Sequence, residues 1–167
     1  SIDPNIGKLK KIEKIGLSAN KITQIPVEIG QLSTLINFFI DGNGVVGVPT
    51  EIGNLVNLKM LHLGEGRFEE LPASMGNLSQ LEYLGIHQGI VKSLPSTLGQ
   101  LKKLTWVEIQ ENNLGFGDIE MMVAAFNGTK YSNQGAYGEG STVSLGATQR
   151  IGIKMSGSQN HYVWKKD

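Results

Sequence analysis

The chain has 167 residues, enough for one domain of ordinary size or for a domain and part of another. Its 15 Lys and Arg residues balance its 15 Asp and Glu residues, so no net charge attracts nucleic acid or an anionic membrane surface. The absence of cysteine excludes disulfides and zinc–thiolate sites, and no apolar run reaches the roughly 18 residues of a membrane span. We therefore expect no nucleic-acid partner and no direct membrane insertion.

A 23-residue repeat fills about two thirds of the chain. Each copy carries a glycine followed by the same apolar positions, which in the third copy are Leu55, Leu58, Leu61 and Leu63. The glycines recur without an insertion at Gly7, Gly30, Gly53, Gly76 and Gly99. A fixed period between about 20 and 29 residues, with apolar spacings of three, three and two, is typical of leucine-rich repeats. The chain resembles that family.

The resemblance implies an α/β fold, a right-handed solenoid of about five repeats over residues 1–117. Alternating side chains around Leu61-His62-Leu63 predict a short strand, and successive copies should align these strands in a parallel sheet on the concave face. A proline opens the return segment of four repeats, which predicts a short 3₁₀ or α-helical turn on the convex face. We expect the recurring glycines to serve turn geometry. Asparagines after three of the strands should satisfy buried backbone groups: Asn20, Asn43 and Asn112.

The carboxy-terminal third departs from the repeat. Asp118 is a good N-cap, and apolar residues at three- and four-residue steps predict a capping helix over residues 118–128. Residues 129–167 form a β-rich tail in which the runs 141–145, 151–155 and 161–164 read as strands.

The junction between repeats and tail has a resemblance of its own. The segments 118–120, 131–134 and 160–167, together with the Leu-Pro-x-x-x-Gly-x-Leu form of the repeats, resemble Bacteroidetes-type surface proteins in which leucine-rich repeats lead into an immunoglobulin-like domain. A complete domain of that kind needs about 100 residues, so the tail would supply only its truncated start. This resemblance implies an extracellular or cell-surface location. Unpaired tail strands could also join a neighbouring molecule, giving a tail-mediated dimer.

Solvent-facing positions of the predicted strands form three columns across the sheet. Large apolar side chains there gain nothing from the core, so they are suited to a protein hot spot or a sugar-stacking platform. The alternative is that these aromatic residues are incidental, or that the tail covers them. The predicted ligand-binding residues are Asn37, Phe39, Met60, His62, Tyr83, His87, Trp106 and Glu108.

Catalytic and metal sites have little support in the sequence. In this register no serine or threonine lies beside a histidine with an orienting acid, and no phosphate-binding glycine loop precedes a helix. His62 and His87 would lie roughly 8 Å apart between Cα atoms, without a nearby carboxylate to complete a metal site. We expect a non-enzymatic module without cofactor or metal that binds a protein or glycan through the concave face. The alternatives are a rigid spacer in a multidomain surface protein and a cytosolic scaffold.

Overall fold

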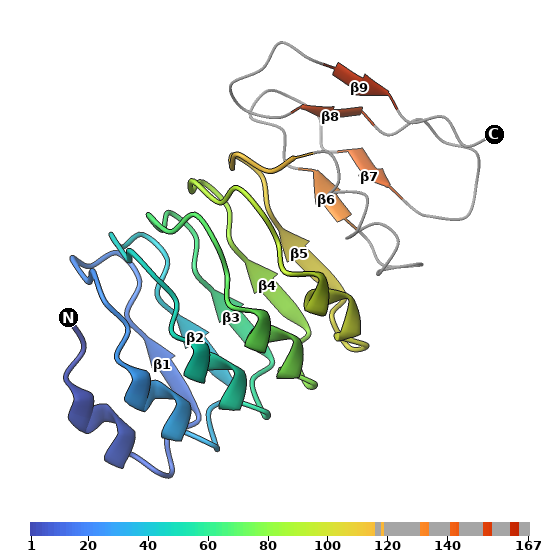
Figure 1. Cartoon of the computed structure of the whole chain (residues 1–167). Coiled ribbons are helices and arrows are strands. Elements are labelled where there is room, and N and C mark those ends of the chain that lie inside the picture. Colours follow the sequence, from blue (N-terminus) through green and yellow to red (C-terminus); the bar gives the residue numbers. More distant parts are fainter. Residues whose placement is uncertain (116–117, 119–130, 134–140, 144–151, 155–160, 164–167) are drawn as a thin grey trace.

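The computed structural model of the chain describes residues 1–115, 118, 131–133, 141–143, 152–154 and 161–163 (Figure 1). The repeats form a solenoid in which each turn contributes one 3₁₀ helix and one short strand. The helices are η1 (Pro4–Lys8), η2 (Val27–Gln31), η3 (Thr50–Asn54), η4 (Ala73–Asn77) and η5 (Ser96–Gln100). The strands are β1 (Lys14–Gly16), β2 (Asn37–Phe39), β3 (Met60–His62), β4 (Tyr83–Gly85) and β5 (Trp106–Glu108).

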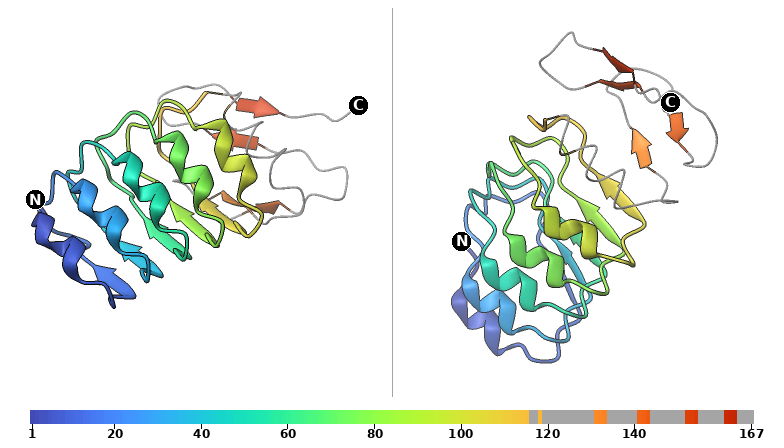
Figure 2. Two further views of the ribbon diagram at one scale, coloured as in Figure 1. Left: turned by 60° about the horizontal axis from the view of Figure 1, so that its bottom comes forward. Right: turned by 45° about the vertical axis from the view of Figure 1, so that its right-hand side comes forward.

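The five strands form one parallel sheet in the order β1-β2-β3-β4-β5, with the 3₁₀ helices along the opposite side of the coil (Figure 2). Each residue pairs with the one 23 positions later, as Leu61 does with Leu84. The middle residue of every strand points into the core; Phe38, Leu61 and Leu84 are fully buried. The predicted sheet and its register are therefore confirmed.

In four of the repeats, a proline is the N-cap residue of the 3₁₀ helix. Pro49 is the N-cap of η3 with φ −69° and ψ 149°, an extended geometry that its ring favours, and Pro26, Pro72 and Pro95 are placed in the same way. The predicted short turn is thus 3₁₀ in all four of these repeats. In the first repeat the proline is one position later, and the Asp3 carboxylate caps η1 by accepting from the Asn5 N–H at 2.7 Å.

The recurring glycines serve close packing between turns, not the turn geometry expected from the sequence. A Cβ on Gly53 would lie 2.4 Å from the Ser74 carbonyl oxygen, and one on Gly30 would lie 2.5 Å from that of Glu51. Their backbone angles are ordinary; among the described glycines only Gly42 has a positive φ. A glycine therefore recurs at this position because neighbouring 3₁₀ helices lie too close together for a Cβ atom.

The predicted asparagines do satisfy backbone groups. Buried Asn43 donates from Nδ2 to the carbonyl oxygens of Leu17, Ile40 and Asp41, and its Oδ1 accepts from the Ile22 N–H at 2.8 Å. Asn112 binds its neighbours in the same pattern, and the more exposed Asn20 retains two of these bonds. In the third repeat, Gly66 replaces the asparagine and the buried ring of Phe68 fills the space beside it.

Short strand pairs lie in the described parts of the tail. β6 (Tyr131–Asn133) pairs with β7 (Ser141–Val143), and β8 (Gly152–Lys154) with β9 (His161–Val163), both antiparallel. The capping helix predicted over 118–128 lies outside the described residues except for Asp118, whose carboxylate accepts from the Leu94 and Gly115 N–H groups. The tail as a unit, with its immunoglobulin-like assignment, stays a prediction. None of the helices in the described part of the chain has the length and apolar character of a membrane span.

Candidate functional site

The solvent-facing side of the parallel sheet, which we call the sheet face, carries all eight residues predicted to bind a ligand. Strand pairing aligns the first two columns of side chains, and backbone bonds such as that from the Gly42 N–H to the Gly64 carbonyl extend the register to the third. All eight predicted side chains are half-buried. The columns are Lys14, Asn37, Met60, Tyr83 and Trp106; Gly16, Phe39, His62, Gly85 and Glu108; and Ser18, Asp41, Gly64, His87 and Gln110.

Three rings form a continuous row across the middle of the sheet face. The Phe39 and His62 rings lie 4.7 Å apart between centroids at a tilt of 53°, and the His62 and Tyr83 rings stack at 4.3 Å and 17°. Tyr83 reaches this row from the first column because Gly85 has no side chain; a Cβ on Gly85 would lie 3.1 Å from the tyrosine ring. A glycine in one column thus makes room for the aromatic residue of the next.

Glu108 lies at the end of the row and binds two aromatic side chains, Tyr83 of the row and Trp106 of the first column. Its carboxylate accepts from Tyr83 Oη at 2.6 Å and from Trp106 Nε1 at 3.2 Å. His87 Nε2 lies 3.8 Å from the same carboxylate. Burial raises the pKa of the Tyr83 hydroxyl far above its usual value, and the hydrogen bond to Glu108 adds to the increase. Tyr83 therefore stays protonated and keeps donating to Glu108 throughout the physiological pH range.

The two histidines are held in separate contacts. The His87 ring lies over Gly64, where a Cβ would come within 2.7 Å of it, whereas His62 lies within the ring row. Burial lowers the pKa of His62, while the charges of Asp41 and Glu108 oppose this decrease. Its Nε2 atom is buried and makes no hydrogen bond with the described residues. His62 is therefore predominantly neutral at pH 7.

The amino-terminal end of the row carries charge on both sides. Lys14 Nζ lies 5.3 Å from the centroid of the Phe39 ring, a cation–π geometry. Asp41 follows Phe39 by two residues on the same face, and its Oδ1 accepts from Ser18 Oγ at 2.8 Å. Lys14, Ser18 and Asp41 are not among the eight residues that the sequence predicted to bind a ligand. They could have been found in the sequence because the strand register places them next to Phe39. The ring row could have been anticipated from Gly85, which leaves space beside the neighbouring aromatic residue Tyr83.

The sheet face combines aromatic, thioether and polar side chains. Asn37 and Met60 lie beside the row in the first column, and the carboxylate of Glu108 is surrounded by donors. Within the described ranges, no group of three or more His, Cys, Asp or Glu side chains is placed to hold a metal ion. Rings, a thioether and fixed polar groups suit recognition of another molecule's side chains.

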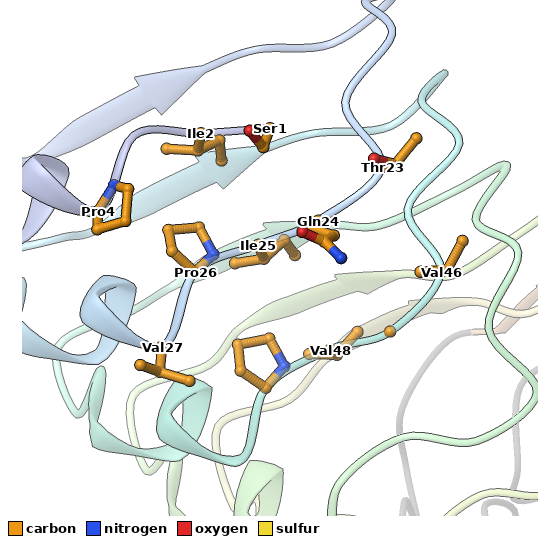
Figure 3. A pocket seen from close by; sticks show the side chains of 12 residues that line it. Ser1, Ile2, Pro4, Thr23, Gln24, Ile25, Pro26, Val27, Val46 and Val48 are labelled. Carbon is orange, nitrogen blue, oxygen red and sulfur yellow. The ribbon is translucent and has the colours of Figure 1, made fainter.

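A hollow lies at the amino-terminal turns (Figure 3), and none of its lining residues belongs to the ring row. It has a volume of about 510 Å³, and the lining residues that the structure describes include no acidic, basic or histidine side chain. Its walls are mainly prolines and aliphatic residues, with the exposed Val27 and Val46 at its edge. Its polar side chains are those of Ser1, Thr23 and Gln24, which are uncharged.

Comparisons with known proteins agree with the repeat architecture. Residues 47–123 match a family described as "Leucine-rich repeat region". A leucine-rich repeat protein from Leptospira interrogans is 29% identical with a TM-score of 0.75, over 78% of this chain and 33% of that one. No curated protein sequence matches significantly.

Two plant receptors are also similar. One is the leucine-rich repeat ectodomain of a membrane receptor kinase from Arabidopsis thaliana in complex with Casparian strip integrity factor 2: 29% identity, TM-score 0.69, covering 78% of this chain and 16% of that one. The other is a plant peptide hormone receptor in complex with RGF2: 32% identity, TM-score 0.65, covering 68% and 19%. This chain spans a third or less of each of the three. Its repeats, its parallel sheet and these similarities show that the chain has a leucine-rich repeat fold, with the family match over residues 47–123.

Proposed function

We propose that this chain is a non-enzymatic recognition module that binds a protein partner through the sheet face. The observation that carries the proposal is the ring row Phe39–His62–Tyr83, ordered by stacking and by the Tyr83–Glu108 hydrogen bond. Half-buried rings held in one conformation lose little side-chain entropy on binding, so more of their contact energy contributes to affinity. Tyr and Trp are also the residues most enriched in interface hot spots.

The similar proteins support a protein or peptide as the ligand class. The two plant receptors were determined in complexes, one of them described as a peptide hormone receptor. A receptor ectodomain functions outside the cell, and we extend this to a cell-surface or extracellular location here, as the tail's resemblance also implies. A role in host interaction is the further expectation for a bacterial surface protein. A glycan ligand and a purely structural spacer are the competing functions.

A selection against the whole chain tests this function. Displayed random peptides and a glycan array would be screened, and the best binder measured against Tyr83→Ala and Trp106→Ala. We expect a peptide binder whose affinity falls roughly thirtyfold in either variant, the change for about 2 kcal/mol at a hot spot. Val56→Ala is the control because Val56 is exposed beyond η3, away from the sheet.

Two results would contradict the proposal. Selected peptides that bind Tyr83→Ala, Trp106→Ala and the unmodified chain equally would place binding elsewhere on the molecule. Glycans that bind the sheet face in preference to every selected peptide would assign the other ligand class. Urea unfolding of each variant separates lost binding from lost folding.

A further inference from the structure

Three hydrogen-bond donors of the sheet face are engaged within the face itself. Tyr83 Oη and Trp106 Nε1 both donate to Glu108, and Ser18 Oγ donates to Asp41. A glycan or an anionic partner would need such donors free for its hydroxyl or acidic oxygens. At the two ends of the ring row, the rings instead lie beside the carboxylates of Asp41 and Glu108.

The border next to Phe39 is acidic. Asp41 lies two residues further along the extended chain, about 7 Å away between Cα atoms, on the same side of the sheet. Glu65 adds a second carboxylate: its Oε1 lies 3.7 Å from the place of a Cβ on Gly42, the residue after Asp41. A positive group above Phe39 would therefore lie within reach of negative charge.

The chain already shows that the Phe39 ring accepts a cation. Lys14 extends from the neighbouring strand until its ammonium lies 5.3 Å from the ring centroid, within the usual cation–π distance of about 6 Å. Lys14 is otherwise an exposed residue of the edge strand β1. Its long side chain can leave the ring at little cost, because a single exposed cation–π contact is weak.

We propose that the sheet face takes an arginine side chain of the protein partner, stacked on the Phe39 ring and paired with the Asp41 carboxylate. This inference rests on the proposed function and names its ligand chemistry. Arginine fits better than lysine because its planar guanidinium can stack on a ring while its N–H groups bind a carboxylate side-on. The bound arginine displaces Lys14, which competes for the ring and repels the incoming charge.

Two small probes test the site directly. The whole chain, isotopically labelled, is titrated with N-acetyl-arginine amide and with its citrulline counterpart, a neutral compound of nearly the same shape. We expect the arginine compound to shift the NMR signals of Phe39, Asp41 and His62, and the citrulline compound to leave them almost unchanged. Equal shifts with both compounds, or none with either, would overturn the inference.

Variants give the second readout, measured with an arginine-containing peptide from the display selection. Asp41→Asn should weaken binding about tenfold, whereas Lys14→Met should tighten it about threefold by removing the competing charge. Glu82→Gln is the matched control because it removes one negative charge at the Lys59 pair, on the turn preceding β4. Weaker binding in Lys14→Met, or equal loss in Asp41→Asn and Glu82→Gln, would contradict an arginine site at Phe39.

The inference and the proposed function fail in different ways. If selected peptides require Tyr83 and Trp106 but contain no arginine enrichment, the sheet face still binds protein and only the arginine assignment is wrong. If no selected peptide depends on Tyr83 or Trp106, the proposed function itself is wrong.

Discussion

The ring of Tyr83 occupies the place on the sheet face where Gly85 has no side chain. A Cβ on Gly85 would lie 3.1 Å from both Cε1 and Oη of Tyr83, closer than most such contacts. The ring row and the hydrogen bond to Glu108 therefore depend on this glycine as much as on the aromatic residues.

Gly85→Ala should displace Tyr83 and weaken its bond to Glu108. We expect about 1 kcal/mol of lost stability from the tight contact and a decrease in the pKa of Tyr83 toward its usual value. The tyrosine is followed by ultraviolet titration, with Tyr83→Phe identifying its signal among the four tyrosines. Gly16→Ala is the control, because Gly16 lies in the same column with no neighbouring atom within 4 Å of an added Cβ. An unshifted Tyr83 in Gly85→Ala would show that the row does not need the glycine.

Gly53→Ala should destabilise the solenoid where two 3₁₀ helices meet. The new Cβ would lie 2.4 Å from the Ser74 carbonyl oxygen, a backbone atom that can move only with its whole turn. Overpacking of this kind costs about 1–3 kcal/mol. Gly47→Ala, where nothing lies within 4 Å, should change stability by less than about 0.5 kcal/mol. Urea unfolding of both variants measures the difference, and equal stabilities would mean that the turns separate more easily than the packing indicates.

Asn43→Asp should be among the most damaging single-atom changes in the chain. The amide Nδ2 donates to three carbonyl oxygens, and a carboxylate oxygen in its place would face those oxygens without a proton. We expect a loss of about 3 kcal/mol at pH 7. Asn20→Asp makes the same change at an exposed site with two such bonds, and should cost about 1 kcal/mol or less. The two are compared by thermal unfolding; a larger loss for Asn20→Asp would contradict the role assigned to the buried amide.

Acid should destabilise the sheet face through His62. Burial lowers its folded-state pKa below the usual value of 6.5, against the charges of Asp41 and Glu108, while the charge of His87 reinforces the decrease. As the pH falls below about 6.5, the unfolded chain binds the proton first, so stability present above that pH is lost as the pH falls through the folded-state pKa. Unfolding free energies at pH 7.5 and 5.5 should therefore differ less in His62→Gln than in the unmodified chain. An equal difference in both would assign the pH dependence to other groups.

The sequence by itself determined the solenoid of 23-residue repeats. A period of 23 with fixed apolar spacing leaves one way to bury Leu61, Leu84 and their counterparts, since each repeat can cover its apolar side chains only against the next. The same period placed all eight predicted binding residues on one face, because strand side chains alternate and the register repeats without a shift. The role of Asn43 and Asn112 in satisfying backbone groups follows for the same reason, whereas their partners came from the structure.

Only the tertiary structure decided how the sheet face is organised. The strand register predicts which side chains are neighbours. It does not predict that the Tyr83 ring lies over Gly85 or that the His87 ring lies over Gly64. Nor does it predict that polar atoms of both side chains lie next to the Glu108 carboxylate. These choices depend on rotamers, which respond to the empty volume left in adjacent strands and to donors and acceptors within a few ångströms. The reason for the recurring glycine was likewise hidden, because Gly53 is required by the distance between two turns and not by its own backbone angles. A periodic sequence specifies its repeating contacts, whereas the contacts that differ from one repeat to the next are settled by packing in three dimensions.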